Sequence, residues 1–286
     1  MSNTRFKPGT IVLTAALLAA ALVFVMPLVW MVSTSVKPER QAASQQIRLL
    51  PDPATITPSQ TAENYSAVWN DSTVQFPLYL RNTLIVAFLA VTGVTLSSAM
   101  VAYGLSRIKW KGRGAVFAIT LATMMIPFPV LMVPLFAIFK QLGWNGTLAP
   151  LWVPAWFGGA FNIFMLRQFF MGIPKELDEA ARIDGMGHWG IFWRVIVPLS
   201  KPALAVVALF NFVYVWNDFI GPLIYLHHRD TYTLALGLQL YQSQAGQTPW
   251  NLLMAASTLC VLPLVLLFIV TQGSFVRGIS ADGLKG

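Results

Sequence analysis

The most regular feature of this sequence is a series of long apolar stretches, separated by shorter segments that carry most of the charge. Six such stretches, each of 19 to 25 residues, cover 11–33, 82–106, 115–139, 148–166, 202–225 and 251–273. Because an α-helix rises 1.5 Å per residue, each stretch is long enough to cross a hydrocarbon layer of about 30 Å. The pattern predicts an all-α integral membrane fold with six transmembrane helices.

The composition agrees with this interpretation. Hydrophobic residues make up 56% of the 286 residues and charged residues only 10%, whereas a soluble domain usually carries about 25% charge. Cys260 is the only cysteine in the chain. An intrachain disulfide and a thiolate metal cluster are therefore excluded.

The loop charges predict an orientation. The connection between the second and third stretches holds Arg107, Lys109, Lys111 and Arg113 without an acid, and such basic loops remain in the cytoplasm. Alternation then places both termini and the 167–201 loop in the cytoplasm as well. The net charge of +8 is explained by this bias, and no nucleic-acid-binding motif accompanies it.

These assignments divide the chain into five regions. Residues 1–10 are predicted as a cytoplasmic tail, 11–33 as the first transmembrane helix and 34–81 as an extracytoplasmic loop. Residues 82–273 form a core domain of five transmembrane helices that includes the 167–201 loop, and 274–286 form a cytoplasmic tail. Within the outer loop, Thr61 is the predicted cap of a short helix that runs through Trp69.

A short acidic segment, KELDEAARIDGMG at 175–187, interrupts the apolar pattern. Pro174 favours a helix start, the acids that follow suit the positive end of the helix dipole, and Gly185 offers a stop. Leu177, Ala180, Ala181 and Asp184 are expected on one flat side of this helix. A second short helix is predicted over 186–197, ended by Pro198.

Two interpretations of this loop are open. It is either an interfacial helix that caps the bundle or a docking site for a protein. Interfacial helices usually present Lys and Arg to lipid, whereas 175–187 holds four acids and two bases. That balance favours a protein partner.

The spacing within this loop carries a family resemblance. Glu179-Ala180-Ala181, three residues, Gly185, nine residues and Val195-Ile196-Val197-Pro198 resemble the EAA motif, E-A-A-x3-G-x9-I-x-L-P, of binding-protein-dependent ABC importers. Val195 and Val197 replace the usual Ile and Leu and remain apolar. Further stretches resemble the second permease of the maltose type: 63–65, 102–107, 126–127, 131–135, 216–219, 222–223 and 275–278.

The resemblance implies a multi-pass subunit of a bacterial or archaeal inner membrane that imports a sugar or oligosaccharide. Its implied partners are a second homologous permease, two ABC ATPase subunits, an extracytoplasmic sugar-binding protein and membrane lipid. The implied ATPase-coupling residues are Glu179, Ala180, Ala181, Asp184, Gly185 and Pro198. A glycerol-phosphate-type cargo is an alternative, and an ATP-independent secondary carrier or a membrane enzyme are rivals from other classes.

Polar residues and prolines inside the apolar stretches are candidates for a substrate pathway, because such residues usually face a cavity. They are Asn82, Asn211, Tyr214, Asn217, Asp218, Pro127 and Pro134. Each has a structural alternative: Asp218 as a helix-end acid, Asn211 in an interhelical hydrogen bond and the prolines as static kinks.

Motifs for catalysis and cofactor binding are missing from the sequence. It has no G-x-x-x-x-G-K-[ST] run, so ATP and Mg²⁺ are expected to be used by partner subunits and no cofactor is expected on this chain. The histidines, His188, His227 and His228, do not form a metal-ligand pattern, and no catalytic triad is recognisable. The chain is therefore expected to be a non-catalytic subunit without a metal site.

Overall fold

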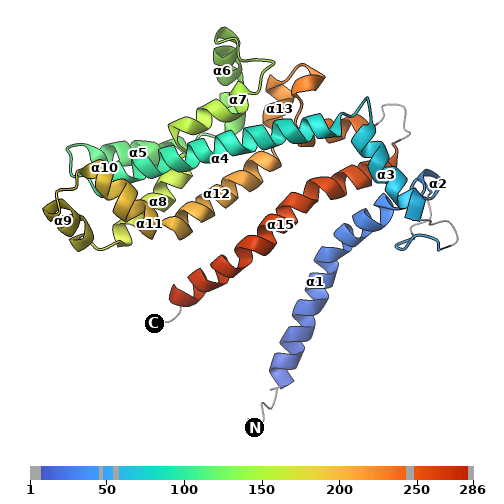
Figure 1. Ribbon diagram of the computed structural model, residues 1–286, viewed down its shortest axis with the longest axis horizontal. Coiled ribbons are helices and arrows are strands. Elements are labelled where there is room, and N and C mark those ends of the chain that lie inside the picture. The colour runs from blue at the N-terminus through green and yellow to red at the C-terminus, as the bar shows by residue number, and fades with distance from the viewer. Residues whose placement is uncertain (1–7, 45–47, 54–57, 243–247, 283–286) are drawn as a thin grey trace. The chain divides into compact units, whose positions relative to one another are not determined.

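A computed structural model describes residues 8–44, 48–53, 58–242 and 248–282. The described residues form helices and connections without a β-strand (Figure 1). The chain divides into two compact units, one made of Met1–Phe76 with Leu238–Leu266 and the other of Pro77–Gly237 with Leu267–Gly286. The predicted terminal tails lie partly outside the described residues, at 1–7 and 283–286.

The first unit contains α1 (Pro8–Ser35), α2 (Glu39–Ala42), α3 (Pro58–Asn70), η4 (Leu238–Tyr241) and the beginning of α15 (Trp250–Asp282). Asn64 of α3 ties these segments together. Its Nδ2 donates to the carbonyls of Ser35 and Lys37, both at 2.9 Å, and its Oδ1 accepts from Asn251 Nδ2 at 3.0 Å. Thr61 lies inside α3, so its prediction as a cap is wrong; the helix begins one turn earlier, at Pro58.

The segment after α1 is held by hydrogen bonds to backbone carbonyls. Lys37 is buried and its Nζ donates to the carbonyl of Arg48 at 2.6 Å, while the Ser33 hydroxyl donates to the carbonyl of Leu49. Burial lowers the pKa of Lys37. The described residues of the predicted outer loop are thus joined to the end of α1 by hydrogen bonds from α3 and by hydrogen bonds to the 48–49 backbone.

The second unit begins with α4 (Phe76–Ser106), whose 31 residues form an unbroken helix. The helices α5 (Arg113–Thr123), α6 (Phe128–Gln141), α7 (Ala149–Trp152), η1 (Val153–Phe157) and α8 (Ala160–Gly172) follow. After the 173–200 segment, described below, come α12 (Lys201–Trp216), α13 (Ile220–Tyr225), η3 (Arg229–Thr231) and α14 (Leu234–Gly237). A buried core joins α4, α8 and α12, centred on Ala102, Leu166, Phe170 and Val207.

Four described helical segments are long and apolar enough to cross a membrane: Val12–Ser35, Phe76–Ser106, Ala149–Gly172 and Trp250–Thr271. Two further helix pairs qualify only if each bent pair counts as one span. These are Arg113–Thr123 with Phe128–Gln141, bent by 99°, and His188–Leu199 with Lys201–Trp216, bent by 78°. The described residues therefore contain four to six candidate spans, and six remains a prediction.

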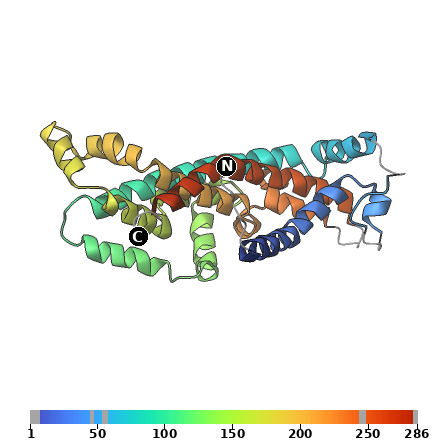
Figure 2. The ribbon, with the colours of Figure 1, turned by 90° about the horizontal axis from the view of Figure 1, so that it is seen from below.

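The third predicted stretch, 115–139, is not one continuous helix. Its break falls at Met124–Pro127, where Pro127 has the extended conformation φ −69° and ψ 141°, and Figure 2 shows the sharp turn between α5 and α6. A proline disfavours helical geometry in the residue before it, which explains why α5 ends here. Pro134, by contrast, lies inside α6.

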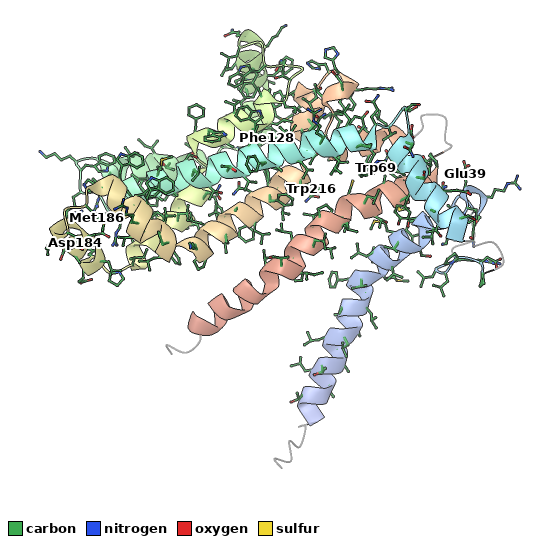
Figure 3. All side chains as sticks on the ribbon, viewed as in Figure 1. Glu39, Trp69, Phe128, Asp184, Met186 and Trp216 are labelled. Atoms are coloured by element: carbon green, nitrogen blue, oxygen red, sulfur yellow. The ribbon has the colours of Figure 1, made fainter. Side chains whose placement is uncertain are left out.

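Two other predicted boundaries are corrected. The fifth stretch, 202–225, ends as a long helix at Trp216 (labelled in Figure 3), and α13 follows as a separate short helix. The sixth stretch does not end at 273, because α15 continues to Asp282 through most of the predicted tail.

Candidate functional site

The acidic segment forms α9 (Glu176–Ile183), a helix of about two turns. The helix ends at a glycine turn that is closed by backbone hydrogen bonds. The Met186 N–H donates to the Ala181 carbonyl at 2.9 Å and the Gly185 N–H to the Arg182 carbonyl at 3.0 Å, the two bonds of a Schellman motif. Gly185 has φ +82°, and a Cβ there would meet nothing within 4 Å. Gly185 is therefore required for its backbone conformation rather than for space within this chain.

A second helical segment follows the glycine turn, as predicted. It consists of α10 (His188–Ile191), the π-helical turn η2 (Phe192–Ile196) and α11 (Val197–Leu199). Figure 3 labels Asp184 and Met186 on either side of the turn between α9 and α10. The prediction that Pro198 ends this helix is wrong, because the helix continues to Leu199. A proline in a regular α-helix clashes with a preceding carbonyl, and the wider π turn η2 lies directly before Val197 and Pro198.

The second segment packs against the long helix α4. Phe192 is buried, with its ring centroid 5.3 Å from that of Tyr103, and Ile191 and Ile196 are fully buried beside it. The Tyr103 hydroxyl also lies 3.3 Å from Nδ1 of His188. The two short helices are thus held by the core of the second unit.

A buried ion pair locks α9 to the end of α4. Nε of Arg107 donates to Oδ2 of Asp178 at 2.9 Å and Nη2 donates to Oδ1 at 2.8 Å, with only 2% and 6% of the two side chains exposed. Such a bidentate pair fixes the orientation of the two groups as well as their distance.

The remaining donors of Arg107 bind backbone carbonyls at the end of α8. Nη1 donates to Phe170 at 3.1 Å and Ile173 at 2.6 Å, and Nη2 donates to Pro174 at 3.0 Å. All five guanidinium N–H groups are therefore used, which offsets the desolvation cost of a buried charge. One side chain connects the ends of two long helices to the short acidic helix.

The rest of α9 is open. Glu176, Glu179, Ala180 and Asp184 are exposed, Leu177 is 42% exposed and Ile183 is 87% exposed. Ala181 is buried in the core, so the prediction that it shares an open side with Ala180 is wrong. An exposed face that mixes acids with Leu177 and Ile183 is typical of a surface that a partner covers.

The predicted pathway residues are placed apart, and several are engaged in the fold. Asn211 of α12 forms a reciprocal amide pair with Asn162 of α8, at 3.2 and 3.4 Å, and also donates to the Val207 carbonyl at 2.8 Å. Asn162 was not predicted, because nothing in the sequence pairs two asparagines 49 positions apart. Tyr214 is 68% exposed.

The other predicted polar residues bind backbone groups. Asn82 Nδ2 donates to the carbonyls of Asp230 and Tyr232, at 2.8 and 3.0 Å. Oδ1 of Asp218 accepts the Gly221 N–H at 3.0 Å at the start of α13, and Asn217 donates to the Val213 carbonyl at 2.8 Å. The helix-end alternative for Asp218 thus agrees with its geometry.

Among the described side chains, no group of three or more His, Cys, Asp or Glu residues is arranged to hold a metal ion.

Comparison with known proteins identifies the family. Residues 93–281 match the sequence model described as "Binding-protein-dependent transport system inner membrane component". The chain belongs to this family. The resemblance of the Glu179–Pro198 segment is thereby confirmed at the level of the family, and the matched range includes α9 and Arg107.

Several curated relatives of this permease family are sugar transport proteins. The arabinooligosaccharide permease AraQ of Halalkalibacterium halodurans is 33% identical over 96% of both chains. The trehalose/maltose permease MalG of Thermococcus litoralis is 34% identical, over 96% of this chain and 97% of its own. The diacetylchitobiose permease NgcG of Streptomyces coelicolor is 31% identical over 93% and 86%.

Solved structures support the fold. A chain of a bacterial ABC transporter that imports the acidic polysaccharide alginate superposes with a TM-score of 0.81, over 96% of this chain and 99% of its own. Its sequence identity of 24% makes this a likeness of fold. A second alginate transporter structure, in complex with a periplasmic protein that holds an alginate pentasaccharide, gives a TM-score of 0.63 at 16% identity.

Proposed function

We propose that this protein is a non-catalytic permease subunit of an ATP-driven importer for a sugar or oligosaccharide. With a second homologous permease it forms the translocation pathway, and an extracytoplasmic binding protein delivers the cargo. The family assignment and the sugar cargoes named for relatives that align along nearly the whole chain support this proposal.

The proposed topology is six spans with both termini in the cytoplasm. It counts each of the two bent helix pairs as one span. The basic 107–113 connection supports this orientation. The prolines at the α5–α6 break support a role for this span in the pathway wall, because broken helices are tolerated at membrane depth where they line a cavity.

The proposed coupling site is the open face of α9, which docks on an ATPase subunit. ATP and Mg²⁺ bind to the ATPases, and their closure moves α9. The observation that carries this proposal is the Arg107–Asp178 ion pair, because it joins α9 directly to the ends of α4 and α8, so that a displacement of α9 is passed to them. Glu179, Ala180, Asp184 and Gly185 form the contact, while Ala181 and Pro198 support it from within the chain.

Cysteine crosslinking tests the coupling site. In a Cys260→Ser background, Ala180→Cys and Ile183→Cys, each labelled with a thiol-reactive photocrosslinker, are expected to crosslink to co-purified ATPase subunits on illumination. Ala181→Cys is the matched control, because the side chain at this position is buried and is expected to remain unreactive. Crosslinking from Ala181→Cys alone, or accessibility of Ala180→Cys only from outside the cell, would overturn the proposal.

The cargo is tested separately. The importer is reconstituted in vesicles with its extracytoplasmic binding protein, and uptake of labelled oligosaccharides is compared with uptake of a glycerol phosphodiester. ATP-dependent uptake of an oligosaccharide is the expected result. Uptake driven by a proton gradient without ATP would favour a secondary carrier instead.

A further inference from the structure

A cavity of about 350 Å³ lies beside α9 in the second unit. Its walls come from the end of α4, the 107–113 connection, the end of α8 and the inner side of α9. Five basic side chains line it: Arg107, Lys109, Arg113, Lys175 and Arg182. The lining acids are Asp178 and Glu179.

The charge of this cavity is strongly positive. Arg107 and Asp178 neutralise each other in the buried pair. Four bases then face one acid, Glu179, which leaves a net charge of +3 from the lining residues. Among the described side chains of the cavity, Arg107–Asp178 is the ion pair that forms, so the other bases keep their charge available for a ligand. The geometry therefore selects an anion.

The position of the cavity at the ends of two candidate spans indicates where this anion comes from. Arg107 follows directly after the candidate span Phe76–Ser106, and Arg113 begins the helix that enters the next bent span. Trp110, which is 42% exposed, lies in the same connection. Tryptophan and basic side chains at the ends of apolar helices are typical of the headgroup layer of a membrane, and basic pockets between spans bind lipid phosphates.

We propose that this cavity binds the phosphate headgroup of an anionic phospholipid such as phosphatidylglycerol. Lys109 and Arg113 approach the phosphate from the connection, and Lys175 and Arg182 approach it from α9. A bound headgroup therefore bridges the same two elements that Arg107 and Asp178 join. The bound lipid is thus a second, reversible connection between α9 and the 107–113 connection, in addition to the Arg107–Asp178 pair. Its site does not depend on which cargo is transported.

The opposite charges of the two sides of α9 agree with this assignment. Its open face carries Glu176 and Asp184, which repel anionic lipid, and Glu179 lies between that face and the cavity. The bases lie on the side of the cavity. The acidic composition of the loop, which favoured a protein partner, therefore describes only one side of the helix.

The test uses the full-length chain in a non-ionic detergent and a photoreactive phosphatidylglycerol probe. Crosslinked peptides are expected to map to the 106–113 and 171–182 segments. Lys109→Gln and Arg182→Gln are each expected to reduce labelling about fivefold, the equivalent of ~1 kcal/mol for one base near an anionic lipid. Lys111→Gln, an exposed base of the same connection that does not line the cavity, is the matched control and is expected to change labelling less than twofold.

Three outcomes would overturn the proposal. Equal losses for Lys109→Gln and Lys111→Gln would show diffuse attraction to the surface and no site. A thermal stabilisation by inorganic phosphate that matches that by phosphatidylglycerol would assign the cavity to a soluble anion. Displacement of the probe by added ATPase subunits would assign it to an acidic side chain of a partner. If Arg182→Gln impairs folding, Lys109→Gln still tests the proposal, because Lys109 is exposed and its substitution is not expected to affect folding.

Discussion

Arg107 and Asp178 are 71 positions apart in the sequence, yet two hydrogen bonds of 2.8 and 2.9 Å join their side chains in a buried pair. The two residues belong to different parts of the chain. Arg107 ends a long apolar helix, and Asp178 belongs to the short helix that carries the family motif. The pair therefore joins the end of a candidate membrane span to the helix that we propose docks on an ATPase subunit.

Removal of one partner of this pair is expected to be costly. Asp178→Asn leaves the guanidinium of Arg107 buried without a counter-charge, which typically costs about 3–5 kcal/mol. We expect a strong decrease in the thermal unfolding temperature in detergent and loss of uptake. Glu176→Gln is the control, since it removes an exposed acid of the same helix and loses at most about 1 kcal/mol of dipole interaction. Equal stability of the two variants would contradict the importance of the pair.

Substitutions of Gly185 test whether this residue is required for its backbone conformation or for direct contact with a partner. At φ +82° a non-glycine residue costs roughly 1–2 kcal/mol, and Asn is tolerated better than a β-branched residue. We expect Gly185→Asn to retain most ATP-driven uptake and Gly185→Val to lose it, with both variants inserted in the membrane at normal levels. If Gly185→Asn is as defective as Gly185→Val, a partner packs directly on the glycine.

Glu179→Lys reverses a charge on the open face without touching the core. Because this side chain is exposed, we expect normal insertion and an unchanged unfolding temperature, together with loss of uptake and of co-purification with ATPase subunits. Measurement of ATPase activity and uptake in the same vesicles checks this. Normal uptake by the Lys variant would count against the open face as the coupling surface.

The asparagine pair between α8 and α12 is expected to behave as one unit. Asn162→Ala and Asn211→Ala should each destabilise the protein by roughly 0.6–1.7 kcal/mol, the range known for polar pairs between membrane helices. Because both single variants lose the same interaction, the double variant should be as stable as the less stable of the two single variants. Additive losses of stability in a double-mutant cycle would show that the two amides act independently. A loss of uptake in Asn211→Ala that is absent from Asn162→Ala would instead indicate that Asn211 belongs to the substrate pathway.

Local signals in the sequence predicted the structure of the 175–199 segment well. Pro174, the acids of the first turn and Gly185 act within a few residues of each other, and the helix, glycine turn and second helix were found as expected. The ends of the apolar stretches were less predictable. A proline can break a span, as Pro127 does, or remain inside a helix, as Pro134 does, and the choice depends on packing.

The partners of buried polar groups were the main features that the sequence did not reveal. Arg107 counted as a basic loop residue and as the last residue of the 102–107 stretch that resembles the maltose-type permease, and Asp178 as one of several acids at a helix start. A basic residue directly after an uninterrupted apolar helix was the available signal, but its partner is 71 positions away. The same limit applies to Asn162 with Asn211 and to Asn64 with Asn251.

The π-helical turn at Phe192–Ile196 has a consequence for the length of the chain in this region. A π turn closes its hydrogen bonds over five residues, so it accommodates one residue more than the neighbouring α-helix. An extra residue in a regular α-helix would rotate everything beyond it by about 100°. The wide turn takes up this residue locally, so that Ile191 and Ile196 stay in the same buried core on either side of it. Deletion of one residue within Phe192–Ile196 is therefore expected to leave the orientation of α12 nearly unchanged, whereas a deletion in the regular part of α12 would turn the residues beyond it to a different side.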